Sequence, residues 1–403
     1  MQIVQAVFGV FHHFELAREL QRRGHLSTIY STFPWRRLKR EGLPREKVQT
    51  FPWLHVPEIL LRQRGVRGEW LYDQLGYANA LAFDEWTLRR IPQCDAFIAL
   101  SGAGLKTGIR VQQMGGRFIC DRGSTHIRYR AELVEEEHRR WGAAEGSRDD
   151  PRDMAREEDI YEKVDALTVP SSYSARTYVE RGIPADKIHV LPYGVLLDRF
   201  KKVDDPPADR FEVLYVGRVS LPKGFPYLLE AFARLKAPNK HLTVIGAMPP
   251  EMKNVLSKLP TESVTFTGPI PQLELKERMS RSHVMVMPSL DEGMALVQGQ
   301  AMACGCPVIA TTNTGAEDLF TDGVEGYIVP IRDPEALQDR MQRVADDNSL
   351  QQRMSEAALA RVRGLGGWQQ YGDAWEQLLW EMTGQAKVRI CPGRSWETQK
   401  TPI

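Results

Sequence analysis

The sequence has little net charge, few cysteines and no long apolar run. Lysine and arginine number 53 and aspartate and glutamate 52, so the basic excess that is typical of dedicated nucleic-acid binders is absent. The five cysteines form no C-x-x-C pair and suit a reducing compartment. No apolar stretch approaches the ~18 residues of a membrane-spanning helix. Since the first residues lack the pattern of a secretory leader, we expect a cytoplasmic protein. From the balanced charge we expect that it binds no nucleic acid.

What is present is an alternation of short apolar runs and helical patterns. This rhythm predicts βα units in parallel sheets, and a polar segment with two adjacent prolines interrupts it at 196–210. We therefore predict an α/β protein with two doubly wound, Rossmann-like domains, residues 1–195 and 211–365, joined by that linker and facing each other across a cleft. A helix within 366–384 and an aperiodic tail at 385–403 follow.

Two basic residues share one strand-to-helix loop in the second half. Arg218 and Lys223 follow an apolar run and Gly217, and a helical pattern begins directly after Gly224. Arginine offers a bidentate fork, lysine a point charge and the helix start free N–H groups, which together suit a dianionic leaving group. The alternative interpretation is a pair of solvated surface cations.

A second loop and helix extend over residues 288–307. Glu292 and Gly293 lie in the turn after an apolar run, and helix signals begin near residue 295 and end at Gly305. A carboxylate in such a turn can accept hydrogen bonds from sugar hydroxyls, and a glycine lets a ligand approach the backbone. Gln300 lies one to two turns into this helix.

As an ordered set, these segments resemble the retaining glycosyltransferases of the large GT-B family (group 1) that includes sucrose, glycogen and lipopolysaccharide-core enzymes. The similarity is carried by G-R-x4-K-G, P-S-x2-E-G and A-M-A-x-G-x-P-V-I-A-T, and it covers residues 155–345 strongly and the N-terminal half in outline. It implies transfer of a hexosyl group from a nucleoside-diphosphate sugar to a saccharide or lipid-linked saccharide in envelope or exopolysaccharide synthesis. It implies no metal or other cofactor, because cationic side chains serve where other transferases use a divalent ion. It also implies that the helix within 366–384 crosses back to the first domain.

The resemblance assigns roles to residues of the second half. Arg218 and Lys223 would hold the donor diphosphate and Glu292 the donor sugar. Further donor contacts are implied for Gly217, Ile270, Gly293, Met294, Ala295, Leu296 and Val297. The family's E-x7-E motif has its second glutamate replaced by Gln300 in this chain. An amide still binds a diol but lacks the charge-assisted strength of a carboxylate, so we expect a change in donor affinity or identity.

The first half departs from the family pattern. Many members carry Gly-Gly after the first strand, whereas this chain has Gly9 and then Val-Phe-His12-His13. Gly9 still lets the donor phosphate approach the backbone. We treat His12 and His13, together with Asp121 and Arg122 of a later loop, as candidate acceptor ligands; packed or solvated histidines are the alternative. His126 resembles the histidine that the family places near the anomeric carbon, with a structural role as the alternative.

Two rival functions stay open. Ser101 to Gly108, with Asp121 at the end of the next apolar run, resembles a dinucleotide fingerprint, which would indicate an NAD(P)-dependent oxidoreductase. Gln300 alone favours a non-catalytic nucleotide-sugar sensor.

Two charged stretches bear on the surroundings of the protein. Residues 33–70 carry nine basic and four acidic residues interleaved with aromatics. This pattern is typical of anionic membrane surfaces, so we expect peripheral contact with the inner membrane; acceptor-pocket aromatics are the alternative. Residues 132–160 carry 11 acidic and five basic residues, which predicts a solvated helix and loop. Nothing in the sequence predicts the oligomeric state.

Overall fold

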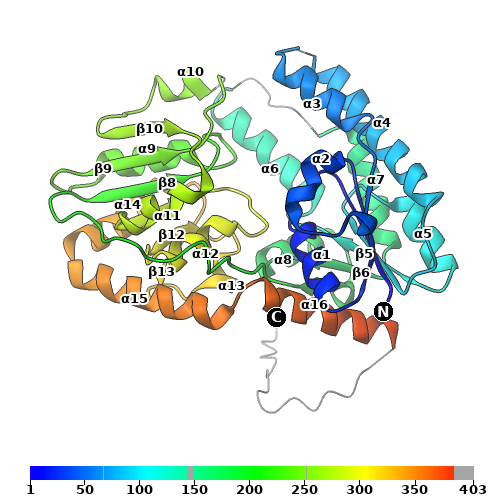
Figure 1. Ribbon diagram of the computed structural model, residues 1–403. Coiled ribbons are helices and arrows are strands. Elements are labelled where there is room, and N and C mark those ends of the chain that lie inside the picture. Colours follow the sequence, from blue (N-terminus) through cyan, green and yellow to red (C-terminus); the bar gives the residue numbers. More distant parts are fainter. Residues whose placement is uncertain (67, 144–148, 251, 385–403) are drawn as a thin grey trace.

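The chain folds into two lobes, each built around one parallel sheet (Figure 1). The computed structural model describes residues 1–66, 68–143, 149–250 and 252–384. The expected tail at 385–403 lies outside these residues. In Figure 1 the first lobe is coloured blue to green and the second green to orange.

The sheet of the first lobe has seven strands in the order β3-β2-β1-β4-β5-β6-β7. All neighbouring strands pair in parallel, and the order reverses between β1 and β4, as in doubly wound sheets. The strands are β1 (Ile3–Val7), β2 (Leu26–Ser31), β3 (Val48–Thr50), β4 (Ala96–Leu100), β5 (Arg117–Asp121), β6 (Ala166–Val169) and β7 (Ile188–Val190).

Helices cover both faces of this sheet, because successive parallel strands need crossover connections. The first of them buries Leu16, Ala17 and Leu20, which recur at helical spacing, against the sheet. The helices are α1 (His13–Arg22), α2 (Trp35–Leu38), α3 (His55–Gln63), α4 (Glu69–Leu88), α5 (Leu105–Gln113), α6 (Ile127–Arg140), α7 (Pro151–Lys163) and α8 (Ser172–Val179).

The second lobe repeats the design with six parallel strands in the order β10-β9-β8-β11-β12-β13. The strands are β8 (Glu212–Val216), β9 (His241–Ile245), β10 (Val264–Gly268), β11 (Val284–Met287), β12 (Val308–Thr311) and β13 (Gly326–Val329). The helices are α9 (Phe225–Arg234), α10 (Met252–Leu256), α11 (Gln272–Ser280), α12 (Leu296–Ala303), α13 (Ala316–Leu319), α14 (Pro334–Asp346) and α15 (Asn348–Leu365).

The two doubly wound domains predicted from the sequence are confirmed. Each apolar run that predicted a strand forms a strand in the structure. Three strands were missed: β2, β3 and β7. The last two have only three residues each and lie at the edges of the sheet, where a short polar sequence such as Val-Gln-Thr can pair without an apolar run. The segment 196–210 packs on the second lobe, with Phe200 buried in its core.

The helix α16 (Trp368–Thr383) follows the second lobe in sequence and packs on the first. Figure 1 shows it in red beneath that lobe, beside α1. Its buried side chains join the core that contains β1 and α1; they are Tyr371, Trp375, Leu378 and Leu379. Polar contacts fix its register, since Arg23 donates to Asp373 at 2.6 Å and His25 lies 2.8 Å from Glu376.

A second connection between the lobes is made by α6, and it corrects the prediction of a solvated helix at 132–160. Glu137 of this helix is fully buried. Its carboxylate accepts hydrogen bonds from Trp141 Nε1 at 2.8 Å, from Tyr227 Oη of α9 at 2.7 Å and from Arg332 Nε at 2.8 Å. A carboxylate loses hydration on burial and needs such donors in return. Composition could not indicate this, because two of the three donors, Tyr227 and Arg332, come from the other lobe.

Candidate functional site

A cavity of about 960 Å³ lies between the lobes. It is lined by loops that follow β1, β5 and β11, represented by His12, Arg122 and Glu292. These loops leave the carboxyl ends of parallel strands, which is where doubly wound sheets bind ligands. The cavity therefore joins candidate residues from both halves of the sequence.

On the second-lobe side, Glu292 is held by its own loop and by a lysine of the neighbouring one. Its N–H donates to the Asn313 carbonyl at 2.9 Å. Its carboxylate forms an ion pair with Lys223, which belongs to the loop between β8 and α9. Ser289 Oγ lies 3.3 Å from the same carboxylate oxygen. The predicted carboxylate, which lines the cavity, is thus in direct contact with one of the two predicted cations, and Lys223 itself is not part of the lining.

The loop that carries Lys223 owes its shape to the next residue. Gly224 has a φ of +62°, and a Cβ there would collide with the Pro288 carbonyl, so the loop can lie against the β11 end only with glycine. Arg218 lies on the same loop, is exposed and does not line the cavity. Gly217 is likewise outside the lining, and its N–H donates to the Ile245 carbonyl.

The start of α12 faces the cavity. The residues predicted as donor contacts that line it are Met294, Ala295, Leu296 and Gln300, whereas Gly293, Val297 and Ile270 do not. The carbonyl of Gly293 is turned toward the first lobe, where it accepts a hydrogen bond from Ser171 Oγ at 2.5 Å. A Cβ at this position would collide with the backbone of Gly123. This glycine therefore permits close contact between the lobes.

Asp291 is a residue of the same loop that sequence reasoning missed. It is buried and accepts hydrogen bonds from Thr125 Oγ1 and from Tyr173 Oη, each at 2.9 Å. Burial raises the pKa of this carboxyl group, and the two hydrogen bonds offset only part of that effect. Both donors come from the first lobe and lie more than 100 positions away in the sequence. No local pattern around Asp291 therefore predicts the contact.

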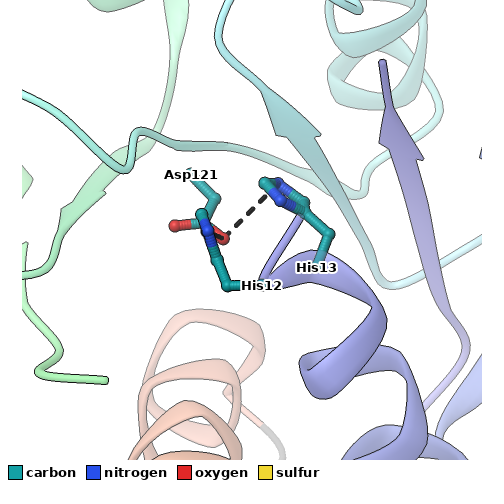
Figure 2. A group of neighbouring side chains, drawn as sticks. All are labelled: His12, His13 and Asp121. Atoms are coloured by element: carbon teal, nitrogen blue, oxygen red, sulfur yellow. Dashed lines mark hydrogen bonds and ion pairs between the residues drawn. The ribbon is translucent and has the colours of Figure 1, made fainter. Parts of the chain in front are cut away.

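On the first-lobe side, three predicted residues form one cluster (Figure 2). Asp121 Oδ2 lies 2.9 Å from His12 Nε2 and 3.4 Å from His13 Nε2. Burial lowers the pKa of His13 to about 3, so this imidazole is neutral at pH 7. Burial alone would raise the pKa of Asp121, but the two histidines and Thr168 bring it below its usual value. His12 lines the cavity, and the other two lie behind it.

Two further first-lobe candidates differ in position. Arg122 lines the cavity and pairs with Glu157 of α7 at 2.9 Å. Gly9 does not line it, and its N–H donates to Thr32 Oγ1 at 2.9 Å. Other carboxylates of the α7 region also face the cavity, and burial together with neighbouring carboxylates raises the pKa of Asp153 to about 6. This wall of the cavity is therefore rich in acidic groups.

His126 lies away from the cavity lining and has a structural contact. Its Nδ1 accepts a hydrogen bond from Arg128 N at 3.2 Å, which caps the N-terminus of α6. The ring lies against Tyr161 and Tyr178. Burial lowers its pKa to about 4, and this outweighs the opposing effect of Glu158. In this structure His126 is a helix cap and not a cavity residue.

The glycine-rich turn at 101–108 has a packing explanation. Asp84 accepts hydrogen bonds from the N–H groups of Lys106 and Thr107 at the start of α5, at 2.9 and 3.0 Å. A Cβ at Gly104 would overlap the ring of Phe97. A dinucleotide pyrophosphate binds to these helix-start N–H groups, and a carboxylate already occupies them. The turn therefore does not support the oxidoreductase interpretation.

The basic and aromatic stretch at 33–70 divides into packed and exposed parts. Phe33 and Trp35 pack on the first-lobe core. Trp53 and Trp70 expose 72% and 73% of their surface. Among the described residues, no helix combines the length and apolarity that a bilayer crossing requires. The exposed tryptophans remain candidates for a surface contact.

Comparison with known proteins identifies both lobes. Residues 12–194 match the family model "Glycosyl transferase 4-like domain", and residues 198–361 match "Glycosyl transferases group 1". The alpha-D-kanosaminyltransferase of Streptomyces kanamyceticus is 30% identical over 193 residues, which are 44% of this chain and 50% of that protein. The chain spans about half the length of the curated relatives it matches.

Solved structures share the fold. Sucrose-phosphate synthase from Thermosynechococcus elongatus superposes with a TM-score of 0.71 at 21% identity, covering 96% of this chain and 100% of that one. Anabaena HepE in complex with UDP-glucose superposes with a TM-score of 0.64 at 16% identity, covering 94% and 99%. Since the two family models together match most of the chain and both lobes have the GT-B arrangement, the chain belongs to the group 1 glycosyltransferases.

Proposed function

We propose that the protein is a retaining glycosyltransferase that moves a hexosyl group from a nucleoside-diphosphate sugar to a saccharide or lipid-linked saccharide acceptor. The observation that carries the proposal is the ion pair between Glu292, which lines the interlobe cavity in the loop before α12, and Lys223 of the neighbouring loop. The relatives support it: HepE was solved with UDP-glucose, and the kanosaminyltransferase is named for sugar transfer.

In this proposal the second lobe binds the donor. Lys223 keeps one N–H on Glu292 and directs the others to the diphosphate, because an ammonium group has three donors. The N–H groups at the start of α12 supply further donors to the same anion. Arg218 adds a second cation from the same loop and reaches the diphosphate only when the donor is bound. Glu292 accepts hydrogen bonds from the sugar hydroxyls, and Gln300 from the ribose.

The reaction in this proposal needs no protein nucleophile. The acceptor hydroxyl attacks the anomeric carbon from the side that the diphosphate leaves, and a phosphate oxygen takes its proton. The protein contributes positioning and stabilisation of the negative charge that develops on the diphosphate, as Lys223 and the α12 N–H groups would provide. In this proposal Lys223 and Arg218 serve in place of a divalent ion at the diphosphate.

The donor is tested by its effect on stability. A panel of UDP-, GDP- and ADP-sugars is added to the protein, and we expect one base to raise the melting temperature, since a ligand that binds only the folded state stabilises it. The same donor, incubated with candidate saccharide acceptors, should give a product with the donor's anomeric configuration by NMR. Binding without hydrolysis or transfer would instead indicate a sensor. NADH binding would revive the oxidoreductase interpretation.

We further propose that the acceptor is reached at an anionic membrane surface. The exposed Trp53 and Trp70 lie within a stretch with a basic excess, and His55 of the same stretch lines the cavity. We expect the double variant Trp53→Ala/Trp70→Ala to sediment with anionic vesicles several-fold less than the wild type at low salt. Leu273→Ala removes an equally exposed apolar side chain from the second lobe and should change nothing. Equal sedimentation of all three would contradict the membrane contact.

A further inference from the structure

We propose that His12, His13 and Asp121 bind one divalent ion of the zinc type beside the cavity. His12 directly precedes α1, His13 is the first residue of that helix, and Asp121 is the last residue of β5 (Figure 2). Each offers one ligand atom, and these atoms lie within 4.8 Å of one another. The site is independent of the diphosphate contacts proposed for Lys223.

The spacing of the three ligand atoms suits a shared ion. Asp121 Oδ2 lies 2.9 Å from His12 Nε2 and 3.4 Å from His13 Nε2. Zinc binds such nitrogen and oxygen atoms at about 2.0–2.1 Å in a tetrahedral arrangement, so neighbouring ligand atoms are about 3.3 Å apart. Small side-chain shifts are therefore enough to bring all three atoms onto one ion.

The other polar atoms of two of these side chains are already held in place. His12 Nδ1 lies 3.1 Å from Tyr193 Oη, and Asp121 Oδ1 accepts a hydrogen bond from Thr168 Oγ1 at 2.9 Å. Contacts of this kind orient metal ligands in proteins and fix the imidazole tautomer. With these contacts in place, His12 Nε2 and Asp121 Oδ2 face the region next to His13 Nε2, where the ion would bind.

His13 provides an independent observation. Its side chain is completely buried, and neither ring nitrogen makes a hydrogen bond to any part of the chain that the structure describes. Buried polar atoms are nearly always paired, so an imidazole in this state, with Nε2 facing a carboxylate, indicates a ligand that bonds to it. A metal ion is a ligand that both a neutral imidazole and a carboxylate bind.

The fourth coordination position faces the cavity, because His12 lines the cavity wall. Sites with three protein ligands keep one position for water or a substrate oxygen, and we assign it to a water or hydroxyl oxygen from the cavity. Two imidazoles and one carboxylate favour Zn²⁺ or Co²⁺ over Mg²⁺ and Ca²⁺, which prefer oxygen ligands.

The test measures metal binding directly. The full-length protein, freed of any histidine tag and treated with a chelator, is dialysed against Zn²⁺ and analysed for metal, and Co²⁺ titration follows the visible absorption of the bound ion. We expect one ion per chain and a higher melting temperature with metal. Asp121→Asn and His12→Gln keep the side-chain volume and should bind at least about 100-fold more weakly, since even outer-shell changes cost 10–100-fold.

His189→Ala removes a histidine outside the cluster and should bind metal like the wild type. Circular dichroism of each metal-free variant checks that it is folded. The proposal is overturned if the wild type takes up no stoichiometric ion, or if the cluster variants take it up as tightly as the wild type. Donor-sugar binding by the chelator-treated protein is measured separately, so that failure of the metal site leaves the proposed transferase function untouched.

Discussion

The two walls of the cavity are built in different ways. On the second-lobe wall, Glu292, Gln300 and the start of α12 belong to one continuous segment, and Gln272 joins them from the start of α11. Lys223 contacts Glu292 from a neighbouring loop without lining the cavity. The first-lobe wall is assembled from separate connections, so that His12 contacts Asp121 across 109 positions of sequence. Chemistry held in one segment can be recognised from spacing, whereas chemistry assembled by folding cannot. The following experiments test whether this structural division is also a division of function.

The largest effect is expected at the second-lobe wall. Lys223→Ala removes the cation from Glu292 and from the proposed diphosphate site, and we expect the transfer rate to fall about 10²- to 10³-fold, as when one preorganised charge-stabilising donor is lost. Arg218→Ala should lower it about 10²-fold. Steady-state kinetics with the donor identified by the stability panel measures both.

Lys253→Ala, an exposed lysine on α10 of the same lobe, is the matched control and should keep full activity. Near-normal transfer by Lys223→Ala would remove the diphosphate role and, with it, the assignment of donor binding to this wall.

The next effect concerns a contact between the two lobes outside the cavity. Glu137→Ala leaves the Tyr227 hydroxyl and the Trp141 indole without their buried acceptor and takes one carboxylate from Arg332. We expect the free energy of unfolding, measured by urea titration, to fall by about 3 kcal/mol, the usual cost of breaking a buried charged network.

Glu135→Ala, at an exposed position of the same helix, should stay within about 0.5 kcal/mol of the wild type. Equal stability of the two variants would show that α6 does not hold the lobes together.

The same division explains what the sequence could predict. Apolar runs in the sequence predicted ten of the thirteen described strands, because buried parallel strands are continuously apolar. Glu292 and Lys223 were predicted as site residues because each lies in a short motif that follows a strand. The roles of Glu137 and Asp291 were missed, because each accepts hydrogen bonds from the opposite lobe and no local sequence pattern indicates such a partner.

A moderate effect is expected from restoring the family's second glutamate. Gln300→Glu places a carboxylate where the ribose diol is proposed to bind, and hydrogen bonds to a charged acceptor are stronger than those to an amide. We expect the Kd for the nucleoside diphosphate, measured by calorimetry, to fall up to about tenfold. Gln272→Glu adds the same charge at another point of the cavity lining and should leave the affinity unchanged or lower it. Parallel changes in both variants would indicate a general charge effect and contradict a ribose contact.

The smallest effect belongs to the first lobe and concerns pH. Burial lowers the pKa of His126 to about 4, whereas an exposed histidine titrates near 6.5, so between these values the unfolded chain binds the proton more readily. The free energy of unfolding therefore keeps its full value from His126 above about pH 6.5. It falls by about 1 kcal/mol as the pH drops toward 4, once solvent screening is allowed for.

His126→Asn keeps a side-chain acceptor for Arg128 N but does not titrate. We expect urea titrations of wild type and variant to diverge within this window, with the wild type losing more stability. Identical pH profiles would place the imidazole in solvent, and His126 would again be available to the cavity.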